Sequence, residues 1–191
     1  MYHELMNGLL NGGTLMEIIP EELVEETWQE VAEFSPSHGQ KEMEKLGKEQ
    51  PDLLSFMVVF TEDLAPEVKE LAIYLFFVVY RIFEKSSKKK IRKISGKEIE
   101  KCYESNEKLV EKTAGIHEKF LERIAKTQVL AQPHVMKYIL FTLMEPDEED
   151  PIELTDDDTG YLFMLLKTVI DLLDQADLPS DIGRKSLSIL P

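Results

Sequence analysis

Hydrophobic residues recur at helical spacing along most of the chain. Between residues 20 and 34, apolar side chains return every three or four positions, and the intervening positions are mostly glutamate. This spacing is typical of a helix with one buried face. Five segments begin at or beside a proline, which the first helical turn tolerates because its missing N–H would have no partner there. The pattern predicts helices at residues 20–34, 37–49, 53–60, 68–83, 96–129, 133–144 and 158–176.

Two of these segments lack a polar face. Residues 53–60 and 68–83 are almost wholly apolar, so we expect both to be buried all round. Runs of this kind also suit buried strands, and residues 57–60 are of the types that strands favour. Each run follows a proline and an acid, and the second is longer than an average strand. We therefore assign both runs to helices.

The longest predicted helix, 96–129, begins with a capping box in which Ser95 and Glu98 satisfy free N–H groups. Its apolar residues alternate by three and four from Ile99 to Phe120, which makes a heptad seam that includes the polar Asn106. Such a residue fixes the register between two helices, either between subunits or within one core. The pattern predicts an all-α fold: a single-domain bundle or irregular stack of six to seven helices with one long central helix.

The length of 191 residues suits one domain, which we place at residues 20–177. Residues 1–19 contain Asn-Gly pairs that favour turns, and we expect an arm there and a tail at 178–191. The first residues lack the basic start of a secretory signal. The longest apolar run is interrupted by Arg81 and falls short of the roughly 20 residues that cross a bilayer. We expect a cytoplasmic protein without membrane insertion.

Acidic residues outnumber basic ones by 37 to 22, and the formal net charge is -15. A field of this sign repels a phosphate backbone, which argues against nucleic-acid binding through the overall charge. A hydrophobic content of 43% is ordinary for a chain with a core and excludes a wholly disordered chain. The single cysteine, Cys102, excludes an intrachain disulfide, and its place on the seam predicts burial instead of reactivity.

Patterns that mark catalytic or metal centres are missing from the sequence. No histidine has a glutamate three positions earlier, and the zinc-protease and phosphate-loop motifs do not occur. The pair His117-Glu118 is the one histidine–acid pair in a strongly helical segment; it could transfer protons or form half a metal site, but we interpret it as a half-exposed histidine with a solvated neighbour. If Gly160 is the sixth position of a calcium loop, Leu166 stands where a glutamate is required. We therefore assign no catalytic residue, no cofactor and no metal ligand, and expect the aspartates at 156–158 to stabilise a helix start.

The most distinctive feature is a basic connector at residues 85–97, which contains seven bases and no acid. It is either a solvated loop, or it docks on an acidic surface, namely residues 145–158, the 20–34 helix or another subunit. A third possibility is anion binding, because Lys93 and Lys97 flank the start of a helix, where free N–H groups point outward. The candidate residues for binding an anion or a partner are Lys88, Lys89, Lys90, Arg92, Lys93 and Lys97.

Three functional hypotheses follow from these observations. The first is a non-enzymatic helical protein that acts as an adaptor, by binding a protein partner or by self-association. The second is a module that binds an anion or a nucleic-acid backbone through the basic connector; the connector lacks the interleaved aromatic residues that read bases. The third is a helical enzyme whose carboxylate site the sequence does not single out among 37 acids.

Overall fold

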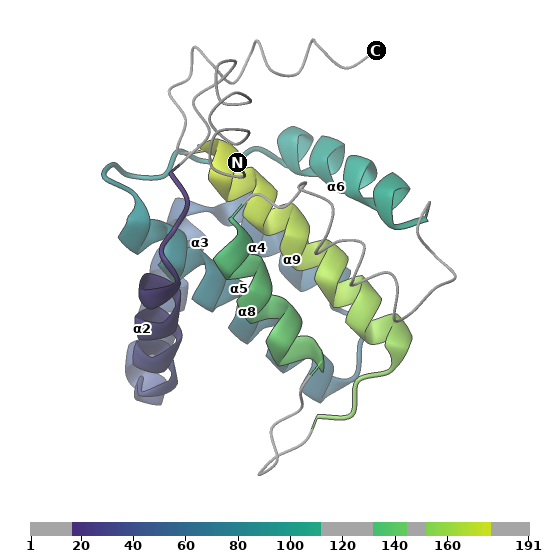
Figure 1. Ribbon diagram of the computed structural model, residues 1–191, viewed down its shortest axis with the longest axis horizontal. Coiled ribbons are helices and arrows are strands. Elements are labelled where there is room, and N and C mark those ends of the chain that lie inside the picture. The colour runs from purple at the N-terminus through teal and green to yellow at the C-terminus, as the bar shows by residue number, and fades with distance from the viewer. Residues whose placement is uncertain (1–16, 112–131, 145–151, 177–191) are drawn as a thin grey trace, which may run out of the picture.

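The computed structural model describes residues 17–111, 132–144 and 152–176. Within these ranges the regular secondary structure is entirely helical, which confirms the predicted all-α class. The strand alternative for residues 57–60 is wrong, because these residues lie in a helix. The helices of the described residues are α2 (Glu21–Ala32), α3 (Pro36–Glu49), α4 (Pro51–Phe60), α5 (Pro66–Ser86), α6 (Gly96–Glu111), α8 (Pro133–Met144) and α9 (Asp156–Ala176) (Figure 1).

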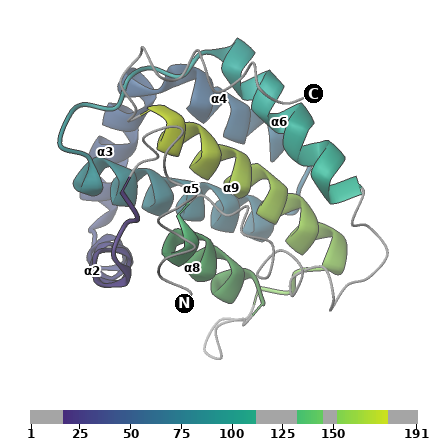
Figure 2. The same ribbon diagram turned by 45° about the horizontal axis from the view of Figure 1, so that its top comes forward.

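The two 21-residue helices, α5 and α9, form the centre of the fold. Helix α9 packs against α5, α6 and α8, and Figure 2 shows it between α6 and α8. Nearly every residue of α9 from Leu162 to Leu173 is therefore buried. Helix α6 lies on one flank of α9, and residues 112–129, which the sequence pattern joins to α6, lie outside the described residues. The seam positions 113, 116 and 120 and the pair His117-Glu118 lie outside them as well.

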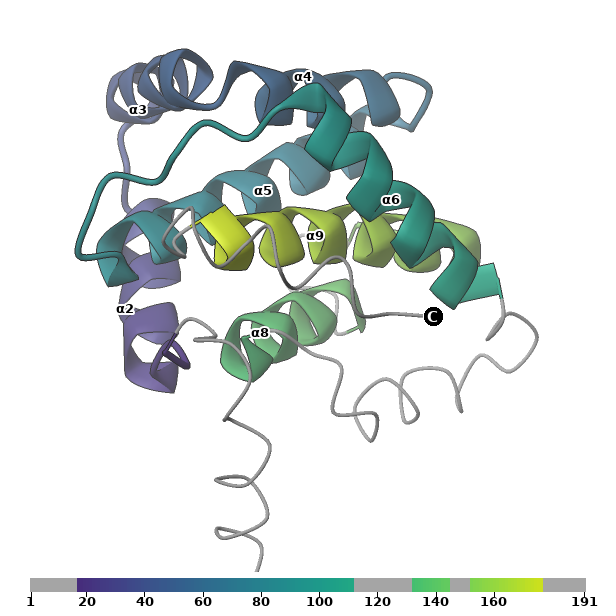
Figure 3. The same cartoon turned by 90° about the horizontal axis from the view of Figure 1, so that it is seen from above.

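Helix α4 differs from the prediction of complete burial. Leu53, Phe56 and Met57 face the core, whereas Val58, Val59 and Phe60 are 44%, 57% and 36% exposed. The reason is position: α4 lies in an outer layer with α3, and its contacts with α3, α5 and α6 do not cover its last turn (Figure 3). A short apolar helix at the edge of a fold keeps one uncovered face whatever its composition.

Helix α5 was also predicted to be buried on all sides, and this is confirmed for its second half only. From Leu75 to Phe83 every residue except Arg81 is buried, because α2, α4, α8 and α9 surround this part. In the first half Tyr74 is 36% exposed.

The neighbouring α3 buries only Leu46, as expected from its charged sequence. None of the described helices meets the length and hydropathy needed to span a membrane.

Residues 17–19 are held against the ends of α8 and α9. The Ile19 amide donates to Gln132 Oε1 at 2.8 Å, and Ile19 is 1% exposed. Gln132 Nε2 donates in turn to the Glu17 carbonyl at 3.3 Å and to Asp174 Oδ1 at 2.6 Å. Gln132 has a left-handed backbone conformation with a φ of 55°, which residues other than glycine rarely adopt. The three hydrogen bonds of its side chain offset the strain of this conformation. Residues 1–16 of the predicted arm and residues 178–191 of the predicted tail lie outside the described residues.

Candidate functional site

The basic connector has a fixed backbone. Ile91 and Ile94 are buried in the core, and the buried side chain of Gln50 joins the connector to the corner between α3 and α4. Gln50 Nε2 donates to the Arg92 carbonyl at 2.8 Å, and the Ile94 amide donates to Gln50 Oε1 at 3.0 Å. The charged side chains between and before these anchors point outward, since all of them are exposed. The connector is therefore an ordered surface segment.

Three of its bases pair with acids of the same chain. Lys85 forms an ion pair with Glu30 of α2. Lys90 Nζ lies 3.0 Å from Glu49 of α3, and Arg92 lies 2.8 Å from Glu98 of α6. These contacts agree with docking on an acidic surface, and the acids of the predicted 20–34 helix contribute one of them.

The start of α6 does not offer free N–H groups in the way the anion hypothesis requires. The Gly96 amide donates to the Asp52 carboxylate at 2.9 Å, and the Ser95 amide donates to Glu98 at 2.9 Å. The Glu98 amide donates back to Ser95 Oγ at 3.4 Å, so the predicted capping box is present. Burial would raise the pKa of Glu98, but hydrogen bonds from Ser95 and Arg92 outweigh it and hold that pKa below its usual range. Two carboxylates of this chain thus occupy the helix start.

Four of the six candidate bases are exposed, and no described acid pairs with them. Lys88, Lys89, Lys93 and Lys97 form no ion pair with any residue that the structure describes. Lys90 and Arg92, by contrast, are neutralised in part by Glu49 and Glu98. The structure therefore divides the candidate set into four solvated lysines and two bases that hold the connector in place.

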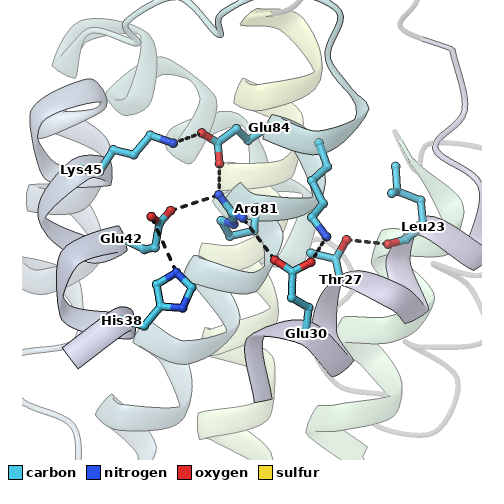
Figure 4. Close-up of polar contacts among 9 residues, drawn as sticks. Leu23, Thr27, Glu30, His38, Glu42, Lys45, Arg81 and Glu84 are labelled. Carbon is cyan, nitrogen blue, oxygen red and sulfur yellow. Dashed lines mark hydrogen bonds and ion pairs between the residues drawn. The ribbon is translucent and has the colours of Figure 1, made fainter. Parts of the chain in front are cut away.

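A cluster of charges joins α2, α3 and α5 around Arg81 (Figure 4). The Arg81 guanidinium lies 2.5 Å from Glu84, 3.1 Å from Glu42 and 3.4 Å from Glu30. Lys45 of α3 pairs with Glu84 at 2.6 Å. Among the described residues, the buried Nε of Arg81 has no hydrogen-bond partner. The cluster links three helices at the surface and also includes His38 of α3, whose Nε2 lies 4.0 Å from Glu42 (Figure 4).

The described carboxylates whose pKa is shifted, Glu21, Glu30, Glu49 and Glu98, all have it lowered, which does not favour the enzyme hypothesis. Hydrogen bonding to Lys85 lowers the pKa of Glu30, and hydrogen bonding to Tyr80 lowers that of Glu49. A general acid needs the opposite shift. A shallow hollow on α5 has one acid in its lining, Glu70, and it opens to solvent. Two facing carboxylates in a closed pocket, which this hypothesis requires, do not occur there.

Helices α6 and α9 share a buried polar network. Asn106 Nδ2 donates to Thr168 Oγ1 at 3.1 Å and to Asp171 Oδ2 at 3.0 Å. Asp171 also accepts from Lys167 Nζ at 2.6 Å, and only 5% of the Lys167 side chain is exposed. The seam residue Asn106 thus sets the register between two helices of one core, which is one of the two alternatives that the sequence left open.

Cys102 lies beside this network, in surroundings that disfavour its thiolate. Burial raises the pKa of its thiol to about 12, and the charge of Asp171 acts in the same direction. The thiol is therefore protonated at neutral pH, whereas attack requires the thiolate. The prediction that Cys102 has a packing role agrees with this environment.

The exposed end of α4 is a surface that the sequence analysis missed. We call Val58, Val59 and Phe60 the α4 patch. Its inner edge is aromatic: the Phe60 ring lies 4.7 Å from Phe56 and 4.9 Å from Tyr103 of α6, between ring centres. The Tyr161 hydroxyl donates to the Phe60 carbonyl at 2.8 Å and ties α9 to this turn. The apolar run of residues 53–60 contains no local signal that its last three residues are uncovered.

Metal ligation was not predicted, and the described residues contain no group of three or more histidine, cysteine or acidic residues placed to hold an ion. Of the three aspartates at the start of α9, Asp158 caps the helix together with Thr155. Asp158 accepts from the Thr155 amide at 3.0 Å and from its hydroxyl at 2.6 Å, while the Asp158 amide donates to Thr155 Oγ1 at 3.0 Å. Residues 145–151 of the predicted acidic loop lie outside the described residues.

Comparison with known proteins finds no matching family model, no matching curated protein and no matching solved structure.

Proposed function

We propose that this chain is a non-enzymatic interaction protein that binds a protein partner through the α4 patch. The observation that carries the proposal is the exposure of three consecutive large apolar side chains at the end of α4. Scattered apolar residues are normal on a protein surface, whereas contiguous ones mark interaction sites. An adaptor role follows from such a surface. We assign it to the cytoplasm because a single cysteine provides no disulfide of the kind found in exported domains.

The residues packed beneath the α4 patch hold it in a fixed shape, which favours binding. Phe60 is held by two aromatic rings and by the bond from Tyr161 to its carbonyl, so it presents a fixed shape. A preformed surface loses little side-chain entropy on association, which leaves more of the burial energy for affinity. Rigid aromatic and branched residues are therefore suited to the centre of an interface.

The test is selection from a displayed library of random peptides against the full chain. We expect enriched clones to bind the wild type and lose at least about tenfold in affinity for a Val58→Ser, Val59→Ser variant. Phe141→Ser is the matched control, because Phe141 on α8 is 59% exposed, much like Val59 at 57%. Figure 3 shows α8 and α4 on opposite sides of the α5–α9 pair. Absence of enriched clones, or equal loss in the control, would contradict the proposal.

A second candidate function is anion binding by the connector, which the exposure of Lys88, Lys89, Lys93 and Lys97 favours. These lysines project from a backbone held by Gln50, so their charges stay close along one segment. The carboxylates at the start of α6 weigh against this candidate, because they fill the position that a bound anion would take. We therefore rank it below the α4 patch.

Heparin and single-stranded RNA are suitable probes of this candidate. If the connector binds a polyanion, replacing Lys88, Lys89, Lys93 and Lys97 by glutamine should weaken binding. The slope of log affinity against log salt should then become shallower by about 0.7 for each RNA phosphate that the variant no longer neutralises. Lys69 and Lys137, exchanged for glutamine, serve as lysine controls outside the connector. Binding that is equal in both variants would refute the candidate.

A further inference from the structure

The α4 patch has an acidic border. Glu62 and Asp63 follow Phe60 closely and are exposed, and residues 51–68 contain no lysine or arginine. On the α6 side, Glu107 lies one helical turn beyond Tyr103, whose ring contacts Phe60, and the charge of Glu107 acts on that tyrosine. Carboxylates therefore lie on two sides of the apolar side chains.

The electrostatics of the two tyrosines agree with this placement. Burial raises the pKa of Tyr161, and the charge of Asp63 raises it further. Burial also raises the pKa of Tyr103, with added effects of Tyr161 and Glu107. Asp63 and Glu107 are thus near enough to act on the aromatic edge of the patch.

No described base neutralises the charges at this border. Acids around Arg81 and along the connector pair with bases of the same chain. Glu62, Asp63 and Glu107 form no ion pair within the part of the chain that the structure describes. An apolar surface with an unpaired acidic border is complementary to a ligand that is apolar in the middle and basic at its margins.

From this complementarity we infer that the α4 patch binds an amphipathic helix of a partner protein, with an apolar stripe bordered by lysine or arginine. The inference rests on the proposed function and names the class of its partner. A helix matches because its residues at i, i+3, i+4 and i+7 form a stripe that covers one turn of α4 and its flanks. Addition of a strand is a poorer match, since the described residues contain no strand whose edge is open.

A second copy of the chain is a poorer match for the α4 patch than a basic helix, because its basic connector does not fit the patch. The connector supplies lysines, but its large apolar residues Ile91 and Ile94 are buried, so it offers no apolar stripe to the patch of another molecule. Contact between a connector and a patch would also join different surfaces, and such head-to-tail contacts extend into chains unless the rotation closes a ring.

Three synthetic helical peptides of about five turns test the inference. They share one leucine and valine stripe and differ only in the border residues, which are lysine, glutamine or glutamate. We expect the lysine peptide to bind the full chain at least about tenfold more tightly than the glutamate peptide, by fluorescence anisotropy. Its advantage over the glutamine peptide should shrink as ionic strength rises from about 0.01 to 0.15 M.

Two variants separate the charge from the apolar surface. Glu62→Gln with Asp63→Asn should reduce the affinity of the lysine peptide about threefold per charge and leave the glutamine peptide unchanged. The matched control, Glu25→Gln with Glu26→Gln, removes two exposed acids of α2 and should change neither. Val58→Ser with Val59→Ser should weaken both peptides.

The outcomes distinguish this inference from the proposed function. Equal affinity for all three peptides would overturn the basic partner while leaving the interaction surface in place. Failure of all three would overturn the inference, and the library selection would then decide the proposed function by itself. A concentration-dependent dimer in sedimentation that disappears in the Val58, Val59 variant would overturn it in favour of a second copy.

Discussion

Replacing Asp171 with alanine should destabilise the protein by about 3–5 kcal/mol, the usual cost of breaking a buried ion pair. Asp171 accepts the 2.6 Å bond from Lys167, whose side chain is 5% exposed. Without this carboxylate the ammonium group is left buried with no counter-charge, whereas Asn106 keeps its bond to Thr168. Urea unfolding followed by circular dichroism should show a lower midpoint with an unchanged slope.

The double variant Lys167→Met, Asp171→Leu is the control for this prediction. It removes both charges, keeps the side-chain volume at position 167 and enlarges it at position 171. Because two desolvation penalties disappear with one attraction, it should be closer to wild type in stability than Asp171→Ala. A cost below about 1 kcal/mol for Asp171→Ala alone would mean that water reaches Lys167 in solution. The packing of α6 on α9 would then be looser than the structure shows.

Replacing Phe163 with alanine should cost about 3–5 kcal/mol, while the same change at Phe141 should stay within about 0.5 kcal/mol. Phe163 is 1% exposed in the centre of α9, whereas Phe141 is 59% exposed on α8. A cavity left at Phe163 is lined by side chains of the packed helices, which relax only in part. The free energies of unfolding of the two variants, measured by the same urea titration, provide the comparison.

This pair is informative because local sequence does not separate the two residues. Each phenylalanine follows a leucine within a run of apolar residues on a C-terminal helix. Equal destabilisation by both changes would contradict the described packing of α8. Destabilisation by Phe141→Ala alone would contradict the central position of α9.

Helix starts depend on residues that are neighbours in the chain, so the sequence could predict them. Prolines stand at the first position of α3, α4, α5 and α8, and Ser95 and Glu98 bond to each other as their spacing indicated. Thr155 and Asp158 form a similar reciprocal cap at α9 that the sequence analysis passed over. The threonine three positions before an acid and ahead of an apolar run was the signal for it.

The candidate site was less predictable, because it depends on residues distant in the chain. The connector was predicted from its charge. The occupation of the start of α6 by a carboxylate was not predicted, since Asp52 lies 44 positions from Gly96. The α4 patch was missed for a related reason. Its apolar residues match those of a buried segment, and only the position of α4 at the edge of the fold leaves them uncovered.

The sequence by itself determined that the chain is helical and where most helices begin, because period and capping involve residues within one or two turns. The tertiary structure alone decided which apolar residues are covered and which charges are buried. Coverage is set by pairs such as Ile19 and Gln132, which are 113 positions apart. No pattern read over a few turns contains that information, since it arises only when helices from distant parts of the chain meet.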